Sequence, residues 1–178
     1  MISVWQFNYY KADVSALDSW KQEFFVILKH MAVPSKKFVN PRFARKGEYE
    51  QVIREIIAQG HCPFCPENFI YHKHPILKKK GRWVITRSSW PYKNAQHHFL
   101  IIGKKHKENF KDLTTQDLNE VKDLVRWATY KFSLKGGALT LRFGNTDYTG
   151  STVAHLHFHL IVPEMKKGKS LPVMFPIG

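Results

Sequence analysis

Three histidines at alternate positions carry the strongest chemical signal in the sequence. His155, His157 and His159 lie within residues 152–163, and apolar residues occupy the positions between and after them. Such alternation is the period of a β-strand, in which successive side chains point to opposite faces. We therefore expect residues 152–163 to form a strand with the three imidazoles on one face.

Such a row of imidazoles needs a chemical reason. Each neutral ring has one donor and one acceptor that need partners, and protonated rings on one face repel each other. A chance run on a half-exposed strand is disfavoured, because histidine is not a preferred strand residue. Two interpretations remain. The rings could bind a metal, or one ring could attack phosphorus as a nucleophile and then be displaced by water or another acceptor.

A second candidate site is the pair Cys62 and Cys65. Two cysteines separated by two residues form half of a zinc site. A redox dithiol and two unrelated buried thiols are the alternatives. A redox motif needs a thioredoxin-like strand and helix around it, which the flanking sequence does not predict. Zinc needs two more ligands, and histidines elsewhere in the sequence can supply them.

At the three histidines the sequence resembles the histidine triad family of nucleotide hydrolases and transferases. The family signature alternates histidine with apolar residues, and here it reads His155-Leu156-His157-Phe158-His159-Leu160-Ile161. Residues 150–154 are similar to the Gly-Ser-rich approach of the dinucleoside polyphosphate phosphorylase branch. The resemblance covers residues 60–165. It implies cleavage of a phosphoanhydride, or a similar phosphorus–heteroatom bond, on a nucleoside monophosphoryl group.

The resemblance assigns the attack on phosphorus to the middle ring, His157. Its Nε2 would need to be unprotonated, and the other ring nitrogen would donate to a backbone carbonyl. His159 lies one pleat along the strand, roughly 7 Å away, and is expected to bind the phosphate oxygens. Ser151 and Thr152 are the nearest donors for the negative charge that develops during the reaction.

Further substrate contacts are expected from two loops. They comprise Ser88, Trp90, Pro91, Tyr92, Asn145 and Gly150. The first four correspond to a Pro-Tyr-containing loop that the family uses around the base and ribose, although Trp90 and Tyr92 could instead be ordinary core aromatics. Asn145 matches in kind an asparagine that contacts the phosphate or leaving group in relatives, and Gly150 can offer its backbone N–H.

For the metal, resemblance to the zinc-containing relatives completes the cysteine pair with His106 and His155. A closed tetrad of two cysteines and two histidines has no open position for water, so the zinc would be structural. His61, His72 and His74 compete for a place among the ligands.

The elements that must position these residues follow from hydrophobic period and capping signals. We expect helices over residues 15–31, over 48–59 with Gly60 after the C-terminus, and from Thr114 or Thr115 to the Gly136-Gly137 pair. We expect a hairpin over residues 75–88, strands over 98–102 and 138–143, and a tight turn over 144–150. The apolar stripes are Val52, Ile56 and Ile57 on the second helix and Leu118, Val121, Leu124, Val125, Ala128 and Phe132 on the third.

This order predicts an α+β fold: an antiparallel sheet with one main helix packed on it. Residues 1–59 are expected to form an N-terminal helical extension, and residues 60–178 the catalytic domain. The family resemblance also implies a homodimer.

Composition restricts the class of partner. The chain has 178 residues and a formal net charge of +14, which favours anionic partners such as nucleotides, polyphosphates or nucleic acid. No nucleic-acid motif is recognisable. There is no apolar run near the length of a membrane span and no apparent signal peptide, so a cytoplasmic location is the default. A non-catalytic nucleotide-binding protein and a DNA-end deadenylating enzyme are the alternative functions.

Overall fold

The computed structural model describes residues 37–178, which lie in one unit that begins at Lys36. The helix predicted for residues 15–31 lies outside the described residues. None of the helices in the described part is long and apolar enough to cross a membrane.

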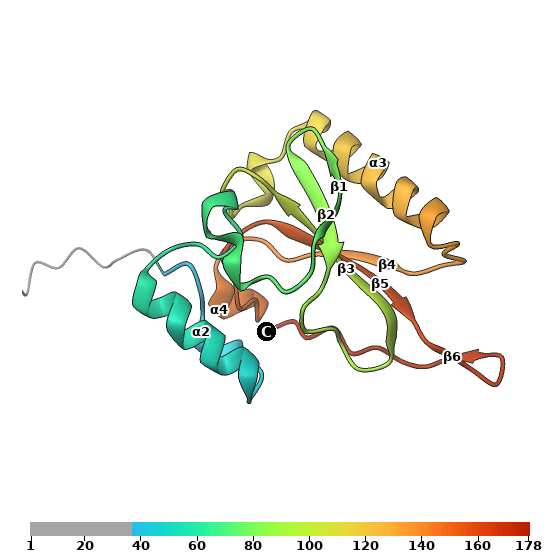
Figure 1. The fold of residues 1–178 in the computed structure, drawn as a ribbon, viewed down its shortest axis with the longest axis horizontal. Helices are drawn as coiled ribbons and strands as arrows, with labels where there is room; N and C mark the ends of the chain where they lie inside the picture. Colours follow the sequence, from blue (N-terminus) through green and yellow to red (C-terminus); the bar gives the residue numbers. More distant parts are fainter. Residues whose placement is uncertain (1–36) are drawn as a thin grey trace, which may run out of the picture. The chain divides into compact units, whose positions relative to one another are not determined.

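A five-stranded antiparallel sheet forms the centre of this unit (Figure 1). Its spatial order is β1-β2-β3-β5-β4. The strands are β1 (Ile76–Lys80), β2 (Trp83–Arg87), β3 (Ala95–Gly103), β4 (Ala138–Leu141) and β5 (His157–Pro163). With helix α3 on one face (Figure 1), this confirms the predicted α+β fold with an antiparallel sheet and one main helix.

Alternation along the strands gives the sheet two different faces. On β3 and β5, Phe99, Ile101, Phe158 and Leu160 form one core with the buried side of α3 (Thr115–Lys131). On the opposite face, Val84, Leu100 and Ile102 lie beneath Phe64 and Phe69. His157 and His159 alternate with Phe158 and Leu160, so they point away from α3.

Helix α3 begins at a capping box and ends earlier than predicted. The Thr114 hydroxyl accepts from the Asp117 N–H, and the Asp117 carboxylate accepts from the Thr114 N–H. The helix ends at Lys131 rather than at the glycine pair, because Ser133 adopts a left-handed φ of 49°. Phe132 then turns back onto Phe99, with ring centroids 4.9 Å apart.

The predicted stripes are each wrong at one position. Leu118 is 43% exposed and Ile57 is 47% exposed. The buried face of α3 is centred on Val121, Leu124 and Ala128, which turns Leu118 toward solvent. The other helix, α2 (Glu48–Gln59), has the predicted bounds and ends at Gly60, whose φ is 68°.

Residues 37–59 pack against the rest of the described unit. Val39 forms an isolated β-bridge with Val153, next to the triad, and these two residues share a hydrophobic cluster with Ile53 and Ile56 of α2. Helix α2 buries its apolar face in this cluster, so residues 37–59 lie in the same compact unit as the sheet.

Three further segments differ from prediction. Strand β5 begins at His157, so residues 152–156, including His155, precede it. Residues 144–150 hold a short helix, α4 (Thr146–Thr149), rather than a simple turn, and β4 stops at Leu141. Beyond β5 the chain forms a small hairpin of β6 (Met165–Lys166) and β7 (Lys169–Ser170). Three 3-10 helices complete the unit: η1 (Pro41–Phe43), η2 (Pro66–Tyr71) and η3 (Phe110–Asp112).

Candidate functional site

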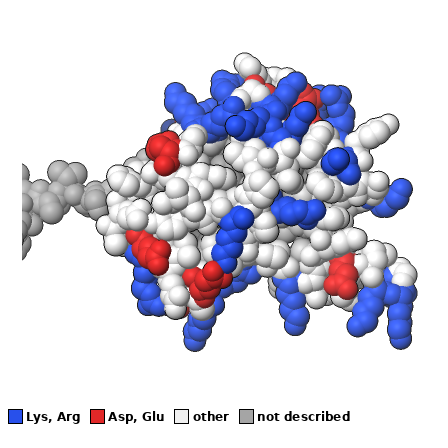
Figure 2. Space-filling view, viewed as in Figure 1, with Lys and Arg blue, Asp and Glu red and all other residues white. Residues whose placement is uncertain are grey.

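A cavity lies between the face of the sheet that carries His157 and His159 and the residues around α2. Aromatic side chains form much of its wall, including Tyr49, Trp90 and Tyr92. Arg45 and Arg142 also line it, whereas no Asp or Glu of residues 37–178 does. Figure 2 shows that Lys and Arg likewise outnumber Asp and Glu on the viewed face. The cavity is therefore suited to an anionic ligand with an aromatic part.

His157 presents an unprotonated nitrogen toward this cavity. Its Nδ1 lies 2.6 Å from the carbonyl oxygen of His155, so Nδ1 carries the proton and donates it, leaving a lone pair on Nε2. Burial lowers the pKa of His157 to about 4; the hydrogen bond to His155 opposes this, and the charge of Arg142 lowers the pKa further. The ring is thus neutral near pH 7 and has the tautomer that a nucleophile needs.

A chain of hydrogen bonds makes Nε2 of His159 a hydrogen-bond donor, whereas Nε2 of His157 is an acceptor. The backbone N–H of Tyr92 donates to Nδ1 of His98 at 3.2 Å, so the proton of neutral His98 sits on Nε2. That Nε2 lies 2.9 Å from Nδ1 of His159 and donates to it. His159 must then carry its own proton on Nε2, and this N–H has no partner among the described residues.

Both rings of this chain are held neutral. Burial lowers the pKa of His98 to about 3, and the nearby charges of Arg45 and Arg142 lower it further. Burial also holds the pKa of His159 well below its usual range. The triad thus offers a lone pair on His157 and an N–H donor on His159, with the ring centroids 4.8 Å apart.

Three buried N–H groups without a hydrogen-bond partner belong to residues that line this one cavity. They are Nε1 of Trp90, Nε of Arg142 and Nε2 of His159, considering residues 37–178 only. An unpaired buried donor costs about 1–3 kcal/mol. Three of them around a cavity without carboxylates favour a ligand rich in acceptor oxygens, such as a phosphoryl group.

The hydroxyls predicted to act as donors point elsewhere. Ser151 Oγ donates to the carbonyl of Val153 at 3.0 Å, and Thr152 Oγ1 donates to the carbonyl of Phe43 at 3.2 Å. Both residues line the cavity, but their hydroxyl protons are already engaged. These two hydroxyls therefore do not offer a free proton to the cavity, unlike the unpaired N–H groups of Trp90, Arg142 and His159.

The structure brings together most of the predicted substrate contacts. Ser88, Trp90, Tyr92 and Gly150 line the cavity together with His157 and His159. Pro91 does not line it; its carbonyl accepts from Arg45. Asn145 does not line it either, because its side chain accepts from the N–H of Asp147 and caps α4.

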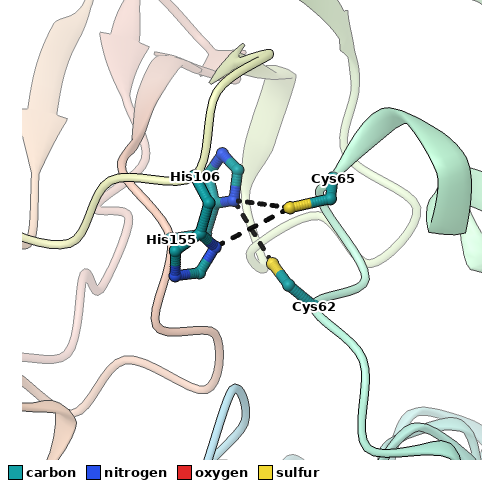
Figure 3. A group of neighbouring side chains, drawn as sticks. All are labelled: Cys62, Cys65, His106 and His155. Carbon is teal, nitrogen blue, oxygen red and sulfur yellow. Dashed lines mark hydrogen bonds between the residues drawn. The ribbon is translucent and has the colours of Figure 1, made fainter. Parts of the chain in front are cut away.

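The predicted zinc ligands form a second cluster, shown in Figure 3. The ligand atoms of Cys62, Cys65, His106 and His155 all lie within 4.8 Å of one another. Cys62 Sγ is 3.2 Å from Nδ1 of His155, and Cys65 Sγ is 3.7 Å from Nδ1 of His106 and 3.9 Å from that of His155. Tetrahedral zinc places sulfur and nitrogen ligands about 3.6 Å apart. The four residues therefore fit a zinc ion.

The far nitrogens of both rings support this fit. His155 Nε2 donates to the carbonyl of Gly103 at 2.7 Å, and His106 Nε2 lies 2.8 Å from a carboxylate oxygen of Glu108. These bonds leave the Nδ1 lone pairs facing the sulfurs, which is the usual arrangement around metal-ligating histidines. Burial raises the pKa of Cys62 to about 12, so this thiol keeps its proton until a cation binds.

The three competing histidines lie outside this cluster. His61 is exposed, although it is next to Cys62 in the chain. His72 Nε2 hydrogen-bonds to Thr86 Oγ1 at 2.9 Å, and the His74 ring contacts that of His72.

Arg45, Tyr49, His98 and Arg142 line the cavity but were not among the site residues predicted from the sequence. His98 lies in a strand that the sequence predicted, but only the pairing of β3 with β5 brings it to His159. The first two belong to the segment that was assigned to an extension. Arg142 follows β4, and only the register between β4 and β5 brings it to the triad.

Comparisons with known proteins found a matching family and a HIT-like relative. Residues 51–171 match the family described as "Scavenger mRNA decapping enzyme C-term binding". An "Uncharacterized HIT-like protein" of Chlamydia muridarum (strain MoPn / Nigg) is 29% identical over 82 residues, which is 44% of this chain and 63% of that relative. The chain thus spans less than two thirds of the length of that relative.

Solved structures with a related sheet include two histidine triad proteins. A HIT family hydrolase from Legionella pneumophila Philadelphia 1 is 26% identical, with a TM-score of 0.45, over 59% of this chain and 95% of that one. A histidine triad nucleotide-binding protein from Candida albicans is 23% identical, with a TM-score of 0.48, over 66% of this chain and 85% of that one. Because the family match covers more than half of the chain and contains the complete triad, the protein belongs to the scavenger mRNA decapping enzyme C-term binding family and is a histidine triad protein.

Proposed function

We propose that this protein is a nucleotide hydrolase or nucleotidyl transferase that uses His157 as its nucleophile. One observation supports this proposal most directly. At the cavity, Nε2 of His157 has a free lone pair, whereas Nε2 of His159 carries a proton. The cavity also combines aromatic walls, which suit a base, with arginines and unpaired donors, which suit a phosphate.

The reaction proceeds in two displacements. Nε2 of His157 attacks the phosphorus of a nucleoside monophosphoryl group, forming a P–N bond while the P–O or P–N bond to the leaving group breaks. The positive charge that develops on the ring is stabilised through the Nδ1–H that donates to the carbonyl of His155. The N–H of His159 donates to an oxygen of the phosphoryl or leaving group. Water or phosphate then attacks the same phosphorus, and the P–N bond to His157 breaks.

The substrate class is a dinucleoside polyphosphate or a nucleoside phosphoramidate. The family is named for mRNA decapping, and a cap is a nucleoside joined to RNA through a polyphosphate bridge. A cap dinucleotide therefore belongs among the candidate substrates.

Zinc is proposed as a structural ion held by Cys62, Cys65, His106 and His155. It would fix the segment that leads into β5, because His155 directly precedes the strand that carries the nucleophile. The carbonyl of His155 accepts from His157, so a ligand to the metal would also hold the tautomer of the catalytic ring.

We also propose a homodimer that uses α3 and the β4 edge of the sheet. Leu118 and Tyr130 on α3 are 43% and 89% exposed, and Leu139 on β4 is 45% exposed. Light scattering after size exclusion should give twice the mass of the chain, and a monomer across the concentration range would refute the dimer.

A substrate panel tests the proposed function. Dinucleoside polyphosphates, a cap dinucleotide and nucleoside phosphoramidates are incubated with and without inorganic phosphate, and products are identified by mass spectrometry. His157→Asn should lower kcat by about 10⁴-fold or more while circular dichroism shows an intact fold. Binding without turnover by the wild type would favour a non-catalytic nucleotide-binding protein, and near-normal turnover by His157→Asn would remove this ring from the mechanism.

A further inference from the structure

Arg142 directly follows β4, the strand that pairs with β5, which carries His157. Strands β4 and β5 pair antiparallel, and their last registered pair is Leu141 with Phe158. Continuing this register places Arg142 opposite His157, and opposite residues of an antiparallel pair share a face. The arginine therefore belongs to the cavity face of the sheet, where it lines the same cavity as His157 and His159.

Three contacts hold the guanidinium group. One terminal nitrogen donates to the hydroxyl of Tyr92 at 2.8 Å, and the other donates to the carbonyl of Gly150 at 3.3 Å. The guanidinium carbon lies 4.2 Å from the centre of the Phe175 ring. Phe175 also contacts His159, with centroids 5.2 Å apart. The charge is thus fixed beside the triad before any ligand binds.

No described residue neutralises this charge. Within residues 37–178, no Asp or Glu forms an ion pair with Arg142, and none lines the cavity. The Nε–H is buried and has no hydrogen-bond partner. A partly buried charge without a counter-ion is costly unless a ligand supplies one.

Among the described residues, no other polar group of the cavity combines a positive charge with a buried N–H that lacks a partner, as Arg142 does. His98 and His159 are buried and neutral, so they offer N–H groups but no charge. Arg45 is the second cation of the cavity; its terminal nitrogens donate to the carbonyls of Trp90 and Pro91, and among residues 37–178 the unpaired buried guanidinium N–H belongs to Arg142. Arg142 is therefore the cation with a free, buried N–H.

We propose that Arg142 is the phosphate anchor of the site, the residue that binds the non-bridging oxygens of the phosphoryl group and makes the cavity select phosphorylated over unphosphorylated ligands. This inference rests on the proposed function and names the residue that recognises the anion. Arginine suits the task because its planar group donates in several directions at once.

Ligand pairs that differ only in the phosphate test this role. Kd values are measured by tryptophan fluorescence for four nucleoside 5′-monophosphates and for the matching nucleosides. The proteins compared are the wild type, Arg142→Gln, Arg142→Lys and Arg87→Gln. Glutamine retains N–H donors for Tyr92 and Gly150 but has no charge. Arg87 is the matched control, because it also packs on a phenylalanine, Phe99, but does not line the cavity.

We expect the preference of the wild type for the monophosphate to fall about 10- to 100-fold in Arg142→Gln. It should persist in part in Arg142→Lys and remain unchanged in Arg87→Gln, with nucleoside affinity preserved in all variants. A preference that survives in Arg142→Gln overturns this inference alone. Equal binding of phosphorylated and unphosphorylated ligands by the wild type overturns the proposed function together with it.

A thermal unfolding measurement distinguishes loss of phosphate binding from misfolding of the variant. Inorganic phosphate should raise the unfolding temperature of the wild type and of Arg87→Gln, but not that of Arg142→Gln. An equal rise in all three proteins would contradict the anchor role.

Discussion

His98 and His159 share a buried hydrogen bond, with Nε2 of His98 2.9 Å from Nδ1 of His159. Because the backbone N–H of Tyr92 occupies the other nitrogen of His98, the direction of this bond is fixed. The backbone of one loop therefore determines that His159 presents a proton to the cavity.

Removing His98 should impair catalysis more than binding. In His98→Leu, Nδ1 of His159 loses its donor and the ring can adopt the wrong tautomer, so we expect kcat to fall about 10²-fold with a smaller change in KM. His98→Gln, which can donate an N–H, should retain more activity. His97→Leu is the control, since His97 stacks on Phe99 on the other face of the strand. Equal activity of His98→Leu and His97→Leu would show that the bond does not set the tautomer.

Metal analysis should find about one zinc per chain. Cys62→Ser should lose this zinc and lower the unfolding temperature, because the segment before β5 would no longer be held. His61→Ala, which changes an exposed neighbour outside the cluster, should retain both. A metal-free wild type of unchanged stability would show that the cluster does not hold a structural ion.

Stability should fall as the pH drops below about 6.5, the ordinary pKa of histidine. His98 has a folded pKa of about 3, so the unfolded chain takes up the proton first and unfolding becomes easier between these two values. At pH 5 the loss from this residue is about 2 kcal/mol. Urea unfolding followed from about pH 7.5 down to about pH 4.5 should show a shallower pH dependence for His98→Gln. An identical slope in both proteins would mean that His98 is accessible to protons in the folded state.

Asp117 should be a major determinant of folding stability. Its carboxylate is 1% exposed and accepts from the Trp83 ring N–H at 3.0 Å and from Lys107 at 2.8 Å. Burial alone would raise the pKa of Asp117, but these bonds and those from Thr114 outweigh it and hold the pKa well below its usual range. Asp117→Ala should cost about 3–5 kcal/mol in urea unfolding, because it leaves buried donors and a lysine unpaired.

Asp123 on the same helix provides the comparison. It pairs with Lys80 and Arg126 near the surface, so Asp123→Ala should cost at most about 1 kcal/mol. Similar costs for the two substitutions would show that the buried network contributes no more than a surface ion pair.

Much of the fold could be predicted because it depends on interactions between residues that are close in the chain. The bounds of α2, the Gly60 end and the capping box at Thr114 follow from backbone hydrogen bonding within a few residues. The alternation around His157 and His159 likewise defines one face of a strand. The start of β5 was misplaced because residues 152–156 share the pattern but do not pair as a regular strand with β3.

The sequence by itself determined the identity of the chemical groups: an imidazole row, a cysteine pair and an excess of positive charge. Only the tertiary structure decided which nitrogen of His159 is free, because the partners that fix its tautomer, Tyr92 and His98, lie far from it in the chain. It also decided that Arg142 lines the same cavity as His157 and that α2 forms a wall of this cavity. Contacts between distant segments depend on strand register and on burial against the rest of the molecule, and a linear pattern of residue types records neither.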